Sequence, residues 1–109
     1  MKKLLCITAI ALAASSANAE FFSGNTLLGK MKGNQADQAM ALGYVVGAHD
    51  LGEGIIYCTP ATITAGKIHD MVRQLLEARP DARHQAATTF IVESLKSTWP
   101  CAQKKGAML

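Results

Sequence analysis

Apolar residues recur every three or four positions along most of the chain, a spacing typical of amphipathic helices. The strongest repeat predicts a helix that is capped by Thr62 or Thr64 and stopped by Pro80, and its apolar positions are Ile68, Met71, Val72, Leu75 and Leu76. A further helix is expected after Pro80, with Asp81 in its first turn. The inner face of that helix is predicted to consist of Ala87, Phe90, Ile91, Ser94 and Leu95.

Two more helices are expected before these. The first covers residues 24–32, has Ser23 or Asn25 as its cap, and carries one apolar side made of Leu27, Leu28 and Met31. After the break at Gly33 and Asn34, a longer helix is expected over residues 35–51. Its apolar stripe consists of Ala36, Met40, Gly43, Val46 or Gly47, and Asp50, and it is widened by Leu42, Val45 and Val46. Each glycine costs about 1 kcal/mol relative to alanine in a helix, and close approach of a neighbouring helix or a partner would offset that cost. The whole pattern predicts an all-α fold, a compact bundle of about four helices.

The first 19 residues have the order of a secretory signal peptide. Lys2 and Lys3 are followed by an apolar stretch over 4–14 and by the small residues Ala17 and Ala19. The apolar stretch is shorter than the roughly 20 residues of a membrane-spanning helix. We therefore expect cleavage after Ala19, no stable membrane anchor, and one mature domain over residues 20–109 in the periplasm.

Charge and cysteine content change this picture in two ways. Without Lys2 and Lys3 the net charge falls from +3 to about +1, and no basic cluster indicates a nucleic-acid partner. The mature chain keeps only Cys58 and Cys101, which in an oxidising compartment predict one disulfide that stabilises a small core by about 4 kcal/mol. Zinc is the alternative for two cysteines, but it would need histidines at ligand spacing.

No catalytic pattern is apparent. The three histidines, His49, His69 and His84, fall on three different elements. His49 and His69 each precede an aspartate, and adjacent helical residues point about 100° apart, so we expect neither pair to act as a base and its orienting carboxylate. The sequence therefore predicts no enzyme, no cofactor and no metal site, and favours a protein that acts by binding another protein.

One loop is the candidate contact region. Ile55, Ile56 and Tyr57 are apolar and lie directly before Cys58. They either fold inward as a small addition to the core or form exposed anchors for a partner, held rigid by the disulfide. Asp50 either orients this loop or contacts the partner itself. These four residues are the partner-binding candidates.

Four sequence motifs together resemble the Rap/Tai family of immunity proteins. They are Ser23–Gly24–Asn25 with Leu27–Leu28, Leu42–Gly43–Tyr44–Val45–Val46–Gly47 with Asp50, Cys58 with Pro60 and Ile63–Thr64, and Trp99–Pro100–Cys101. The resemblance implies a periplasmic all-α domain with disulfides. It also implies that the protein neutralises a peptidoglycan amidase delivered by a type VI secretion system, that it forms a homodimer, and that a protruding loop blocks the toxin's cleft.

The chain departs from this pattern at one pair of positions. Where such proteins often carry a further cysteine pair, this sequence has Met31 and Ala41, so we expect apolar packing to replace a covalent link between the first two helices. The alternative function is a periplasmic acid-stress chaperone, since such proteins are also small, helical and disulfide-linked. The four motifs do not belong to that group.

Overall fold

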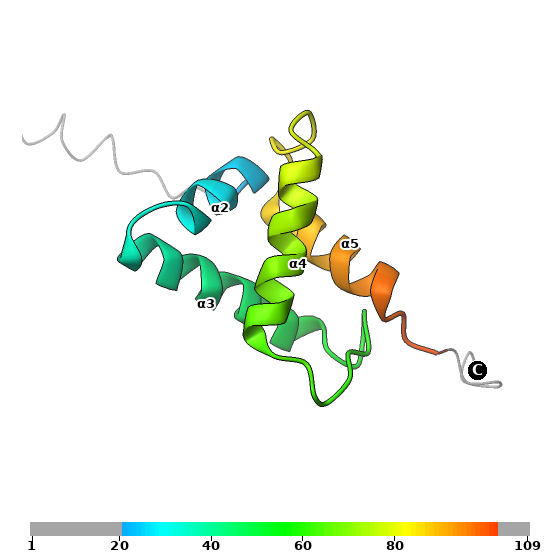
Figure 1. Cartoon of the computed structure of the whole chain (residues 1–109). Coiled ribbons are helices and arrows are strands. Elements are labelled where there is room, and N and C mark those ends of the chain that lie inside the picture. The colour runs from blue at the N-terminus through cyan, green and yellow to red at the C-terminus, as the bar shows by residue number, and fades with distance from the viewer. Residues whose placement is uncertain (1–20, 103–109) are drawn as a thin grey trace, which may run out of the picture.

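A computed structural model describes residues 21–102, and within that range the chain forms four α-helices and no strand (Figure 1). The helices are α2 (Gly24–Met31), α3 (Gln35–Gly52), α4 (Ala65–Ala78) and α5 (Ala87–Thr98). This confirms the predicted all-α bundle. The expected signal peptide and its cleavage site lie outside the described residues, as does the tail from position 103.

Three of the helices begin at a side-chain cap, which explains why their starts could be predicted. The side-chain oxygens of Ser23, Asn34 and Thr64 each accept a hydrogen bond from the backbone N–H three residues later, at 3.1, 2.9 and 3.2 Å. Each bond satisfies one of the N–H groups that a helix leaves unpaired at its start.

The start of α5 differs from the prediction. Asp81 does not lie in the first turn of this helix, because residues 80–84 form consecutive turns and α5 begins only at Ala87. The helix has no side-chain cap; instead the Ala87 N–H donates to the backbone oxygen of Phe22 at 2.9 Å. Phe22 and Ala87 are far apart in sequence, so the residues next to Ala87 contain no local signal for the start of α5. The start of this helix was therefore placed too early.

The core lies where the four helices meet, with α4 crossing α3 and α5 in Figure 1. The predicted inner faces of α2 and α5 are buried, and on α4 Ile68, Val72 and Leu76 are buried while Met71 and Leu75 are half-buried. Met31 and Ala41 are both buried in the same core, so the apolar packing expected at these two positions is present. Burial of a side chain as large as methionine contributes about 1.5–3 kcal/mol.

Of the predicted apolar surface of α3 only Val45 is buried, so this helix turns mainly another face inward. Its buried residues are Ala41, Val45 and Gly52, whereas the predicted stripe points outward and Met40 is 53% exposed. A Cβ placed on Gly43 or Gly47 would meet nothing within 4 Å, so no helix among residues 21–102 packs closely against them. The helix is apolar around most of its circumference, and periodicity therefore could not identify the inner face.

Candidate functional site

The chain reverses direction immediately after α3 in a tight turn over residues 53–57, which we call the contact turn. Its backbone is closed by hydrogen bonds from the N–H groups of Ile55 and Ile56 to the oxygen of Gly52, at 3.1 and 2.8 Å, and from Gly54 to Tyr57 at 2.8 Å. Gly54 has a φ of 79°, a conformation that glycine adopts without strain. The turn thus has a defined shape set by its own backbone.

Three large apolar side chains are exposed at this end of α3. Ile55 is 78% exposed and Ile56 is 40% exposed, so two of the predicted contact residues are accessible. Leu51, in the last turn of α3, is 82% exposed and was missed by the sequence analysis, since nothing in the pattern separated it from buried leucines. Exposed apolar groups close together are typical of protein-binding surfaces. We call Leu51, Ile55 and Ile56 the apolar tip.

Tyr57 is not part of this surface, which corrects its assignment as a contact residue. Its side chain is 1% exposed, and its hydroxyl donates to the backbone oxygen of Ala48 at 2.6 Å. The ring lies against Gly52, where an added Cβ would be 2.5 Å from the hydroxyl. Burial raises the pKa of this hydroxyl above its usual value. Tyr57 therefore belongs to the core and anchors the contact turn from below.

A disulfide fixes the chain that leaves the turn. Cys58 and Cys101 are bonded, with their Cα atoms 4.8 Å apart, which confirms the predicted pairing. The Cys58 N–H also donates to the oxygen of Trp99 at 2.9 Å, and Tyr57 forms an isolated antiparallel bridge with Pro100. The contact turn is thus joined covalently to the segment that follows α5.

A group of polar side chains lies behind the turn. One carboxylate oxygen of Glu53 accepts hydrogen bonds from the Thr59 hydroxyl at 2.8 Å and the Thr59 N–H at 3.2 Å. The Nε2 atom of His49 lies 2.9 Å from the same hydroxyl and 3.3 Å from that carboxylate oxygen. The hydroxyl hydrogen bond lowers the pKa of Glu53, assisted by the Thr59 N–H and by His49, while burial acts in the opposite direction. Sequence analysis missed this group, because its members become neighbours only once the turn forms.

Asp50, the fourth predicted contact residue, is exposed on α3, and the structure does not test whether it contacts a partner. Its carboxylate lies 3.4 Å from Nδ1 of His49, and Asp70 lies 3.3 Å from Nδ1 of His69. The expectation that these adjacent side chains point apart is therefore wrong, because each histidine ring turns toward the carboxylate that follows it. Both distances exceed those of strong hydrogen bonds.

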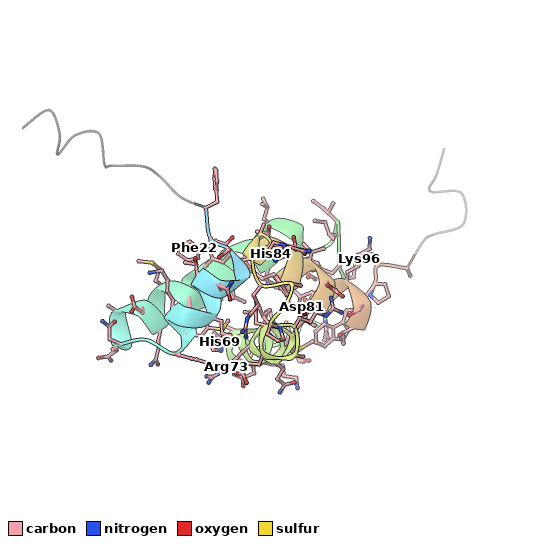
Figure 2. All side chains as sticks on the ribbon, turned by 90° about the horizontal axis from the view of Figure 1, so that it is seen from above. Phe22, His69, Arg73, Asp81, His84 and Lys96 are labelled. Atoms are coloured by element: carbon pink, nitrogen blue, oxygen red, sulfur yellow. A yellow bond between two sulfur atoms is a disulfide. The ribbon has the colours of Figure 1, made fainter. Side chains whose placement is uncertain are left out.

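The remaining features do not form a reactive centre. His69 and His84 lie on separate elements, α4 and the turn before α5 (Figure 2). Within residues 21–102, no three His, Cys, Asp or Glu side chains are grouped as metal ligands would be. An open hollow of about 520 Å³ between α4 and α5 is bordered by Arg79 and Glu93, which neutralise each other in an ion pair of 2.7 Å. No helix in the described part of the chain has the length and apolar character needed to cross a membrane.

Comparison with known proteins decides the family. A family model described as Rap1a immunity proteins matches residues 23–101. The chain belongs to the Rap1a immunity protein family. The match extends from the cap of α2 to the second disulfide cysteine, so it includes the four helices and the contact turn, and it confirms the resemblance carried by the four motifs. No curated protein matches the chain. As an immunity protein it has a toxin protein as its partner, and such proteins are generally not enzymes.

Proposed function

We propose that this Rap1a protein is exported to the periplasm, where it binds a peptidoglycan amidase delivered by a type VI secretion system and covers the enzyme's active-site cleft with the contact turn. The observation that carries the proposal is the pair of exposed isoleucines, Ile55 and Ile56, on a turn anchored by the Cys58–Cys101 disulfide. Family membership supplies the toxin as partner, and the apolar tip supplies a surface for it.

The construction of the turn suits it to this task. Binding costs free energy when side chains and loops must be ordered, and a turn already fixed by hydrogen bonds and a disulfide avoids much of that cost. Apolar anchors that enter a pocket contribute a large share of the affinity at protein interfaces. Two adjacent isoleucines at the tip of a narrow turn could enter a cleft that a flat surface would leave open.

Export to the periplasm rests on the N-terminal pattern and on the disulfide, which is typical of proteins in oxidising compartments. If the whole chain is expressed in a Gram-negative host, we expect the periplasmic fraction to contain a protein that begins at Glu20. Intact-mass measurement checks this. A cytoplasmic product that keeps Met1 would contradict the export part of the proposal and leave the toxin partner untouched.

The proposal includes the homodimer that the resemblance implies, formed through the outward face of α3. This face carries Met40, Gly43 and Gly47, and the helix has no charged residue from Gln38 to Ala48. Sedimentation of the mature chain at about 50 μM should then give twice the monomer mass, and Met40→Glu should give the monomer, because the buried carboxylate would lack a partner. A monomer at all concentrations would contradict the dimer.

Capture of the partner tests the main proposal. The mature chain, residues 20–109 with its disulfide formed, is immobilised and exposed to purified cell-wall amidases and to lysates that contain type VI effectors. We expect an equimolar complex with one amidase and loss of that enzyme's activity on peptidoglycan. If the chain binds no amidase and instead suppresses aggregation of many unfolded proteins at low pH, the acid-stress chaperone is the better account.

A further inference from the structure

The contact turn is held by more than its backbone and the disulfide. Glu53 opens the turn and Thr59 follows it, and one carboxylate oxygen of Glu53 receives both the N–H and the hydroxyl of Thr59. Since the two residues lie on opposite sides of Ile55 and Ile56, this pair of hydrogen bonds closes the base of the turn. Charge-assisted bonds of this kind are roughly twice as strong as neutral ones.

His49 completes the arrangement from α3. The Thr59 hydroxyl has a single hydrogen, which it donates to Glu53, so the 2.9 Å contact with Nε2 of His49 requires a hydrogen on that nitrogen. The same N–H is 3.3 Å from the Glu53 carboxylate. His49 thus donates toward both residues and ties the closed turn to the helix. The other titratable groups that face this site are Asp50 on α3 and Tyr57 in the turn.

We propose that Glu53, Thr59 and His49 form a side-chain clasp that holds the contact turn in one conformation before a partner binds, with the ionised carboxylate of Glu53 as the positioning group. This inference rests on the proposed function for the purpose of the turn, although the clasp itself is a property of the free chain. It assigns a role to three residues that do not belong to the apolar tip.

The clasp makes the shape of the turn depend on pH. The Glu53 side chain accepts two hydrogen bonds as a carboxylate. A protonated carboxyl group would be a weaker acceptor and would carry a donor of its own. Because the pKa of Glu53 is lowered in the folded chain, the clasp is intact above the unfolded pKa of about 4.3 and opens as pH falls through the lower folded value.

Hydrogen exchange on the mature, oxidised chain tests the clasp without any toxin. The Thr59 N–H is bound to Glu53, whereas the neighbouring Cys58 N–H is bound to the backbone oxygen of Trp99 and serves as an internal reference. With rates corrected for the intrinsic effect of pH, we expect protection of the Thr59 amide to fall about tenfold between pH 6.5 and pH 3. Protection of the Cys58 amide should change much less.

Matched variants separate the clasp from general loss of stability. Glu53→Gln should show the low Thr59 protection at both pH values, and Thr59→Val, which lacks the hydroxyl, should show an intermediate loss at pH 6.5. Glu77→Gln is the control, because Glu77 also has a lowered pKa, from its ion pair with Arg73 on α4. It should leave the amide of Thr59 unchanged. Amides of α5 report whether each variant is folded.

Unchanged Thr59 protection in wild type at low pH and in Glu53→Gln would overturn the clasp. That result would not contradict the proposed binding of an amidase, because the exchange experiment contains no partner. Conversely, a chain that shows the clasp but captures no amidase would contradict the proposed function alone.

Discussion

At the scale of the residue, the position of Tyr57 determines which side chains the contact turn exposes. The sequence gives three apolar residues in a row, and without a helical or strand period nothing in that run indicates which one points inward. The answer depends on Gly52, whose lack of a side chain leaves room for the Tyr57 ring. Ile55 and Ile56 could thus be predicted as candidates, whereas the burial of Tyr57 could not.

Gly52→Ala should therefore destabilise the protein. The new methyl group would lie 2.5–2.6 Å from atoms of Tyr57, so the ring must shift, and we expect the free energy of unfolding to fall by about 1–3 kcal/mol. Gly29→Ala on α2 is the matched control, because its Cβ would meet nothing within 4 Å. That change should raise stability by about 0.5–1 kcal/mol. Urea unfolding measures both, and equal effects would contradict the assigned packing.

Acid should weaken the fold through individual carboxylates. The pKa values of Glu53 and Glu77 are lowered, by the Thr59 hydroxyl and by Arg73 respectively. A lowered folded-state pKa gives stability that is present above the unfolded pKa, about 4.3 for glutamate, and is lost as pH falls through the folded value. We expect the urea midpoint to drop between pH 6 and pH 3, and to drop less in the double variant Glu53→Gln/Glu77→Gln. If the urea midpoint drops equally in wild type and in the double variant, groups other than Glu53 and Glu77 cause the loss of stability in acid.

At the scale of the element, the inner face of a helix could be predicted only where that helix is clearly amphipathic. The inner faces of α4 and α5 could be predicted because polar residues interrupt their apolar repeats. Helix α3 offers no such contrast, and the stripe chosen from its spacing proved to be the outward face. The same stripe includes two glycines with open space around them, which no contact within the described part of the chain explains.

Gly43→Ala and Gly47→Ala provide a test of this face. In an isolated chain each change should raise the free energy of unfolding by about 0.5–1 kcal/mol, because alanine favours the helix and meets no obstacle. If the proposed dimer forms, the same changes should lower the free energy of unfolding at high concentration, because the added methyl groups would separate two closely packed helices. Unfolding at about 1 μM and at about 100 μM distinguishes these effects. Equal stabilisation at both concentrations would argue against close packing at the glycines.

At the scale of the whole molecule, the family, the helical bundle and the disulfide could be predicted from motifs and composition. The clasp behind the turn could not, because His49, Glu53 and Thr59 meet only when the chain reverses after α3. Such a site depends on a turn conformation and not on a spacing along one helix. The sequence therefore indicated the region of the contact surface, and the structure identified the side chains that support it.

Removing the disulfide should affect the entire fold. Cys58 and Cys101 are separated by 43 positions, and opening a loop of that size costs about 4 kcal/mol in the chain-entropy model. We expect Cys58→Ala/Cys101→Ala to lower the free energy of unfolding by about this amount. Urea unfolding at pH 7 gives the value. A loss below about 1 kcal/mol would show that the helical core alone stabilises the domain.

The central claim is that the apolar tip enters the toxin's cleft, and inhibition of the captured amidase by tip variants tests it most directly. The double variant Ile55→Asp/Ile56→Asp is compared with Phe21→Asp, which places an aspartate at an apolar residue that is 98% exposed outside the turn. We predict that wild type and Phe21→Asp inhibit the amidase at equimolar concentration, whereas the double variant needs about a hundredfold more protein. Equal inhibition by all three folded proteins would contradict the account and place the contact elsewhere.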